Sequence, residues 1–359
     1  MKPRTVLPDP DDEADPLGPQ SIYDADPSED EDLWFLPPDE DEALPDYLPP
    51  GTRMQERLLF DPRDWYEGQS ELSNELADVA VTFGALDERL RAGPKGWGHR
   101  LALMEVSDLG WWTGDRISAD RLALWTGLRL GSTGDDIQAL FRAGWAVRRL
   151  TTGADPSEGG WESGLTAFLD RMGQGVEEVP EAVADLADVM RNTDSLHPIT
   201  QAAVGFHAWR SLAQGIGQDT EAAIIAARLA AKMGRGGALF LPLALSGPGA
   251  LRGTGEPREK LEAWLSGAGQ AVLAALLHLD RVSAWEQRAR DATQDLSGRT
   301  PPLLLDALTA WPMISAPLAE ELTQASRAAV QRNLDRFTRR GLIREVTGQG
   351  RYRVWTAAL

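Results

Sequence analysis

The spacing of apolar residues constrains this chain most, because it follows a helical repeat through nearly all of the region that can build a core. In the stretch 71–90, Leu72, Leu76, Val79 and Phe83 recur every three or four residues, as on one buried helix face. Strand-like alternation is scarce before residue 300, so the pattern predicts a mostly α fold. Helices are expected at 71–90, 97–109, 119–128, 135–149, 161–172, 180–191, 199–214, 220–233, 257–266 and 267–293.

The chain has 359 residues, more than the roughly 250–300 that one hydrophobic core usually organises. Residues 1–50 contain sixteen acidic and two basic residues and few aliphatic ones, a composition that favours a disordered acidic tail. Its apolar island, Leu33-Trp-Phe-Leu36, has three open interpretations: a tether on the folded body, a motif for a partner, or an acidic mimic that occupies a basic surface. We expect a helical domain of unknown function at 51-295 and a separate C-terminal domain at 299-359.

In the last sixty residues the spacing of apolar residues changes from a helical to a strand-like repeat. Three short helices are expected at 301–311, 316–322 and 327–340, each introduced by Pro or Ser, residues that favour helix starts. The third would bury Val330, Leu334 and Phe337 and end at Gly341. Alternation of period two follows at 342–346 and 351–355, separated by the turn residues 347–350. Three helices and a hairpin in this order predict a C-terminal winged helix-turn-helix.

This segment resembles the bacterial winged helix-turn-helix through Ser326-Arg-Ala-Ala-Val330-Gln-Arg-Asn-Leu334, the exit Gly341-Leu-Ile343 and the wing Thr347-Gly-Gln-Gly-Arg-Tyr-Arg-Val354. The resemblance covers about a sixth of the chain, and it implies double-stranded DNA as the partner. One position departs from the pattern. The glycine usual in the turn between the second and third helices is absent, and Thr323-Gln-Ala325 stands there.

Charge supports a DNA-binding interpretation of this segment. The whole chain has a formal net charge of −19, but residues 301–359 hold eight arginines against five acidic residues. A recognition helix with short side chains at its start and longer polar ones beyond can enter a major groove. The alternative is a protein-interaction module with solvated arginines. The expected DNA-binding residues are Ser326, Arg327, Ala328, Gln331, Arg332, Gln349, Arg351 and Arg353.

The chain as a whole is similar to an alphaproteobacterial family, associated with plasmids and phages, that joins an uncharacterised N-terminal domain to a C-terminal helix-turn-helix. The residues that carry this resemblance are Leu196-His-Pro-Ile199, Phe206-His-Ala-Trp-Arg210, Arg299-Thr-Pro-Pro302 and 315–355. More remotely the layout resembles Fic-type proteins that end in a winged helix. Trp112-Thr-Gly114 has Thr where their inhibitory motif has Glu, and the catalytic loop expected after His207 is missing, so nucleotidyl transfer is not expected.

Little else in the sequence indicates catalysis, and we expect no enzyme activity, cofactor or metal. The four histidines (His99, His197, His207 and His278) lack the spacing of metal ligands. There is no cysteine, and no apolar run reaches the roughly 18 residues of a membrane span, so a cytoplasmic protein is expected. Trp97, Trp111, Trp112, Trp125, Trp145 and Trp161 are expected in the core rather than in a ligand cage.

Together these features predict a sequence-specific DNA-binding protein that regulates transcription. A single recognition helix would bind weakly, so a homodimer is expected, with the helical domain mediating dimerisation or responding to a small-molecule or protein effector. The alternative is a catalytically degenerate Fic-like protein whose winged helix serves regulation or partner binding.

Overall fold

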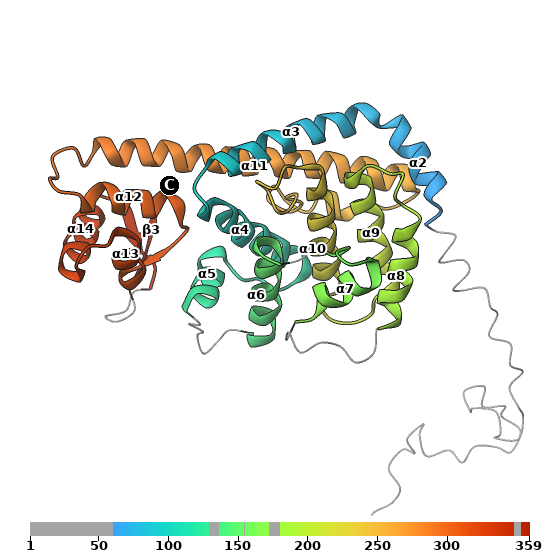
Figure 1. Cartoon of the computed structure of the whole chain (residues 1–359), viewed down its shortest axis with the longest axis horizontal. Helices are drawn as coiled ribbons and strands as arrows, with labels where there is room; N and C mark the ends of the chain where they lie inside the picture. Colours follow the sequence, from blue (N-terminus) through green and yellow to red (C-terminus); the bar gives the residue numbers. More distant parts are fainter. Residues whose placement is uncertain (1–59, 129–135, 154, 172–179, 348–352) are drawn as a thin grey trace, which may run out of the picture. The chain divides into compact units, whose positions relative to one another are not determined.

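The computed structural model describes residues 60–128, 136–153, 155–171, 180–347 and 353–359 (Figure 1). These residues are mostly helical, with a small three-stranded sheet near the C-terminus. The expected disordered tail, 1-50, lies outside the described residues. The elements before residue 299, here called the helical part, are α2 (Pro62–Glu71), α3 (Ser73–Ala92), α4 (Gly96–Thr113), α5 (Ala119–Leu128), α6 (Ile137–Thr151), α7 (Trp161–Leu169), α8 (Glu181–Arg191), α9 (Pro198–Leu212), α10 (Gln218–Ala230), η1 (Ala231–Met233), η2 (Ala250–Arg252) and α11 (Pro257–Asp291).

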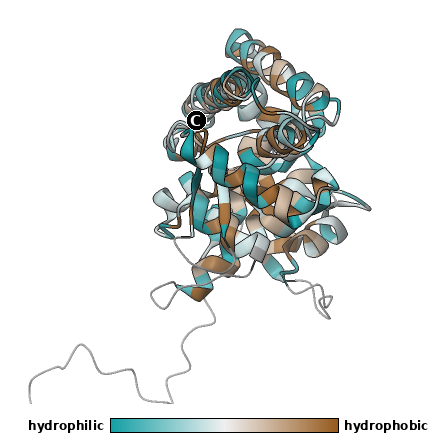
Figure 2. Cartoon of the chain, turned by 90° about the vertical axis from the view of Figure 1, so that its left-hand side faces the viewer, coloured by the Kyte–Doolittle hydropathy of each residue, from teal (hydrophilic) through white to brown (hydrophobic). Residues whose placement is uncertain are grey.

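The helical part is held by one large hydrophobic core. Helices α9 and α10 pack against each other, α3 lies along α11, and α4 contacts α6. Aromatic side chains fill the centre, with Trp65, Phe83, Phe206 and Trp264 all fully buried. Figure 2 shows hydrophobic and hydrophilic residues on the same helices, which is the amphipathic pattern that the sequence predicted. Trp111 is an exception to the expected buried tryptophans, since it is 60% exposed.

Helix α11 was expected as two helices meeting at Gly267, and this prediction is wrong. The helix is continuous over 35 residues. It begins with a capping box between Glu256 and Glu259 and has Pro257 in its first turn, where proline fits without loss of a hydrogen bond. Gly267 is needed for packing: a Cβ there would lie 2.0 Å from the Ala250 main-chain nitrogen. Gly267 therefore lets η2 approach α11, and it does not interrupt the helix.

The C-terminal module, residues 299–359, contains α12 (Thr300–Ala310), β1 (Ile314–Ser315), α13 (Ala316–Thr323), α14 (Arg327–Arg339), β2 (Ile343–Glu345) and β3 (Val354–Ala357). The three helices lie where the sequence predicted them. The strands pair antiparallel in the order β1-β3-β2, with Ile314 opposite Trp355 and Arg344 opposite Thr356. Strand β1 was not predicted, because two residues are too few to show alternation.

A second hydrophobic core underlies this module. Leu304, Leu308, Leu334, Phe337 and Trp355 are its buried centre. Helix α11 adds Trp285 and Ala289 to the same core, and the Trp285 indole N–H donates to the Leu342 carbonyl at 2.8 Å. One helix therefore contributes to both cores.

The helical part and the module also meet at α4 and α12. The Trp97 indole N–H donates to the Thr309 carbonyl at 3.1 Å. Gly96, at the start of α4, sits so near α12 that a Cβ would lie 2.1 Å from the Ala310 carbonyl oxygen. Among the described residues, no helix is long and apolar enough to cross a membrane.

Candidate nucleic-acid interface

Helix α14 is built as the sequence predicted. The Ser326 hydroxyl caps its first turn by accepting from the Ala329 main-chain N–H at 3.4 Å. Val330, Leu334 and Phe337 are fully buried, so they fix the face that packs on the module. Gly341, just past the end, has φ +68°, the left-handed conformation expected after a helix.

The turn between α13 and α14 explains the missing glycine. Gln324 takes the left-handed conformation itself, with φ 51° and ψ 34°, and no other non-glycine residue that the structure describes has a positive φ. Its side-chain amide donates to the Glu321 carbonyl at 2.6 Å, and its carbonyl accepts from Arg299 at 3.1 Å. These bonds help to offset a backbone strain on the order of 1–2 kcal/mol.

The outer face of α14 carries most of the expected DNA-binding residues. Ser326, Arg327, Ala328 and Arg332 are exposed, and Gln331 is half-buried. Arg327 donates to Glu320 at 2.9 Å, a bond that raises the pKa of its guanidinium. Gln331 donates to Asp335 at 2.9 Å. Arg332 forms no hydrogen bond or salt bridge with the part of the chain that the structure describes.

Of the three expected wing residues, the structure describes only Arg353. Gln349 and Arg351 lie outside the described residues. Arg353 is held by Glu345, with the two side chains 2.6 Å apart, and it lies 4.9 Å from the centre of the Trp355 ring. The Glu345 hydrogen bond raises the pKa of Arg353. Because Glu345 already binds this arginine, Arg353 is less available to a phosphate than the sequence suggested.

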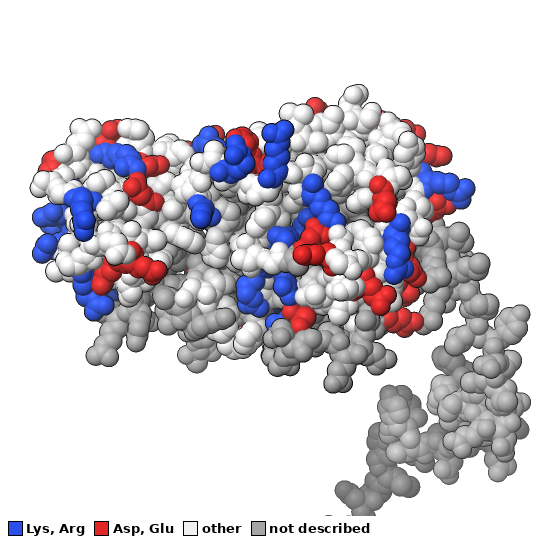
Figure 3. All heavy atoms as spheres, viewed as in Figure 1, with Lys and Arg blue, Asp and Glu red and all other residues white. Residues whose placement is uncertain are grey.

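Two further exposed arginines on α14 were not among the expected site residues. Arg336 and Arg339 form no salt bridge with any described residue, and Arg339 donates only to the Asp335 main-chain oxygen at 3.3 Å. The spacing of Arg339 from Ala328 and Arg332, eleven and seven residues, already places all three on one helix face. Arg340 and Arg344 are instead paired with Asp295 and Asp120. Figure 3 shows basic side chains over the module, which holds arginines but no lysine, with acidic side chains between them.

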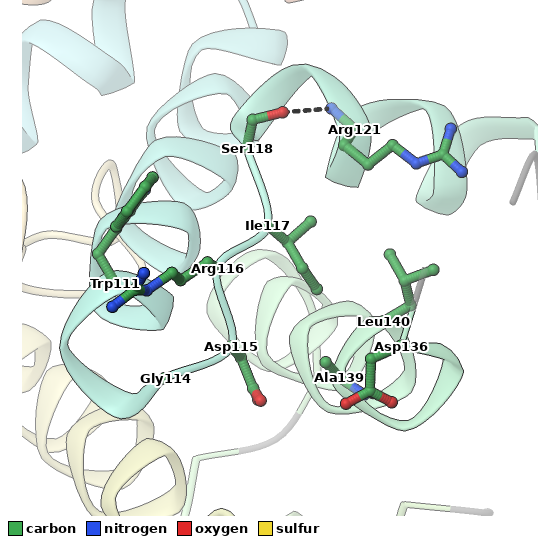
Figure 4. A pocket seen from close by; sticks show the side chains of 10 residues that line it. All are labelled: Trp111, Gly114, Asp115, Arg116, Ile117, Ser118, Arg121, Asp136, Ala139 and Leu140. Atoms are coloured by element: carbon green, nitrogen blue, oxygen red, sulfur yellow. Dashed lines mark hydrogen bonds between the residues drawn. The ribbon is translucent and has the colours of Figure 1, made fainter. Parts of the chain in front are cut away.

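A pocket of about 390 Å³ lies between the end of α4 and the start of α6 (Figure 4). Three of its charged side chains have partners on the protein. Asp115 accepts two hydrogen bonds from Arg142, Arg116 lies 5.4 Å from the centre of the Trp111 ring, and Asp136 caps α6.

Two of the histidines, His197 and His207, have structural surroundings. His197 caps α9 by accepting from the Ile199 N–H at 3.2 Å. His207 is buried beside Trp65 and Phe206, and its burial lowers its pKa to about 3. Within the described ranges, no group of three or more His, Asp or Glu side chains could hold a metal ion.

No protein-family model matches the chain, and no curated protein matches it.

Proposed function

We propose that the C-terminal module is a winged helix-turn-helix, and that the chain is a sequence-specific double-stranded DNA-binding protein that regulates transcription. The observation that carries this proposal is the outer face of α14. Arg332 and Arg339 lie seven residues apart on it, exposed and without a salt bridge to any described residue. An arginine already held by a carboxylate must give up that partner to bind DNA, whereas these two need not.

The shape and surroundings of α14 agree with insertion into a major groove. Ala328 presents a small side chain near the start of the helix, where recognition helices approach base edges. Asp335 lies on the outer side too, but Gln331 donates to it and Arg353 lies 3.8 Å away. These partners reduce the repulsion that its carboxylate would exert on phosphates. Arg332 is therefore a candidate for base or phosphate contact, and Arg339 for phosphate.

Two properties follow from this function. A homodimer would place two α14 helices on half-sites one helical turn of DNA apart, about 34 Å. The helical part would then supply the dimer contact or respond to an effector. Such a regulator would act in the cytoplasm.

A specific observation favours a second function, a module that binds a protein partner. Arg327 and Arg353 are each paired with a carboxylate of the same module, which leaves fewer cations for DNA than the sequence indicated. A degenerate Fic-like protein whose winged helix serves regulation belongs to this class.

Selection of genomic fragments by the purified full chain at about 150 mM salt, where nonspecific phosphate contacts are weak, distinguishes the two. The double variant Arg332→Ala, Arg339→Ala is compared with Arg235→Ala, which removes an exposed arginine of the helical part. Enrichment of a palindromic or repeated site that the double variant loses and Arg235→Ala keeps supports the DNA function. Folded wild-type protein that enriches no site contradicts it.

A further inference from the structure

A cavity of about 400 Å³ lies where the helical part meets the C-terminal module. Arg100 and Leu103 of α4, Ala123 of α5 and His278 of α11 line one side. Met313, Arg344 and the last residues of β3 line the other. Its volume is within the range of small-molecule sites, roughly 300–1,000 Å³. Both cores therefore contribute walls to one cavity.

Arg100 is the unusual group in this cavity. Its side chain is buried, with the residue 4% exposed. One of its nitrogens, Nη2, donates to the carbonyls of Trp311 at 2.7 Å and Leu308 at 3.2 Å, but Nε is sealed from solvent and has no hydrogen-bond partner. No described carboxylate pairs with it, and burial alone lowers its pKa to about 10. A buried guanidinium without an anion is costly, since buried charges are normally paired.

The remaining walls suit an apolar body. Leu103, Ala123 and Met313 present hydrocarbon and thioether surface. His278 has a buried Nε2 without a partner, and its burial, together with the nearby Arg100 and Arg281, lowers its pKa to about 4, so the imidazole is neutral at pH 7. Arg344 and Asp120 form a salt bridge of 2.6 Å and cancel each other's charge. Arg100 is then the only charged side chain among the described lining residues that has no oppositely charged side chain as a partner.

We propose that this cavity binds a small molecule with an apolar body and one carboxylate, and that the carboxylate lies against Arg100. A carboxylate would supply the anion that Arg100 lacks, and a charge-assisted pair with a guanidinium is stronger than a hydrogen bond between neutral groups. The apolar part would cover the surface of Leu103, Ala123 and Met313. Because Arg100 also holds the last carbonyls of α12, the ligand would act on a group that joins the helical part to the module.

The test measures binding by the full chain with three probe carboxylates of graded size, octanoate, benzoate and phenylacetate, beside their primary amides. We expect at least one carboxylate to raise the melting temperature and to bind in calorimetry at least tenfold more tightly than its amide. Arg100→Gln removes the cation. Because that variant also loses bonds to α12 and can fail to fold, Ala123→Phe, which fills the cavity, is the second variant.

Ala77→Phe adds the same ring at an exposed position of α3 and is the matched control. We expect Ala123→Phe to lower the affinity at least tenfold and Ala77→Phe to leave it unchanged. The proposal is overturned if no probe binds up to millimolar concentration, if an amide binds as well as its carboxylate, or if folded Ala123→Phe binds like the wild type. DNA is absent from these measurements, so failure of the DNA-binding proposal would leave their outcome unaffected.

Discussion

The carboxylate of Glu105, on α4, accepts a hydrogen bond of 2.8 Å from the main-chain N–H of Leu243, 138 residues further along the chain. The same oxygen accepts from Ala244 at 2.9 Å, while the other carboxylate oxygen is buried without a partner. Asp87 of α3 holds the preceding part of this loop in the same way, through the N–H groups of Arg235 and Ala238. Two buried acidic side chains thus fix a long loop to the core.

Glu105 predicts a pH dependence of stability. Burial raises its pKa to about 7, from a usual 4.5. Between these values the folded protein keeps a proton that the unfolded chain has lost, so the free energy of unfolding falls as pH rises from 4.5 to 7. The difference corresponds to roughly 3 kcal/mol at 1.36 kcal/mol per unit.

We therefore expect Glu105→Gln to raise the free energy of unfolding above pH 7 and to have little effect near pH 4.5, since a neutral amide can still accept from Leu243. Urea unfolding at pH 5 and pH 8 measures this. Glu67→Gln, at an exposed position of α2, is the control. It should leave the change in the free energy of unfolding between pH 5 and pH 8 as it is in the wild type. An equal effect of Glu105→Gln at both pH values would refute the interpretation.

Gly96→Ala should destabilise the contact between α4 and α12. The added Cβ would lie 2.1 Å from the Ala310 carbonyl oxygen. The shifts of backbone and side chains that such overpacking forces typically lower the free energy of unfolding by about 1–3 kcal/mol. Gly98→Ala, two residues further along the same helix, has nothing within 4 Å. That control should be stabilising by about 0.5–1 kcal/mol. Thermal unfolding of both variants checks the prediction, and similar shifts in the same direction would count against it.

Gln324→Gly should stabilise the module, because glycine adopts the left-handed conformation without strain. The gain should be at most about 1 kcal/mol, since the variant loses the side-chain bond to the Glu321 carbonyl. Gln324→Ala keeps the strain and loses the same bond, so it should be destabilising. Denaturant midpoints of the two variants give the comparison, and a Gly variant no more stable than the Ala variant would show that the turn is unstrained.

Deletion of residues 1–50 should tighten nonspecific DNA binding at low salt. These residues carry a net charge of −14, and an acidic segment competes with phosphates for arginines. Fluorescence anisotropy with random-sequence DNA at 50 and 200 mM salt measures the effect, which should shrink at the higher salt. Affinity that does not change at either salt concentration would exclude competition by this segment.

The sequence predicted the helices well where a long periodic face is buried, as in α3 and α14. The prediction failed at Gly267, which was expected to separate two helices. This glycine instead leaves room for η2, and the approach of η2 depends on tertiary packing that the sequence pattern does not show. It also failed to anticipate that Gln324 would replace a turn glycine.

At the candidate site, helical spacing placed Arg332 correctly on the outer face. The pairing of Arg327 with Glu320 and of Arg353 with Glu345 is a property of neighbouring elements, and single-residue charge cannot distinguish a paired arginine from an unpaired one. The cavity at Arg100 was not predictable either, since its walls come from segments more than 200 residues apart.

The continuity of α11 limits how this protein can be divided. A fragment that starts at residue 299 would leave Trp285 and Ala289 behind, and with them the indole that binds the Leu342 carbonyl. Conversely, a fragment that stops before Trp285 ends inside an unbroken helix. Experiments with isolated pieces, and any exchange of the C-terminal module between proteins, would need to carry the last two turns of α11 along with it.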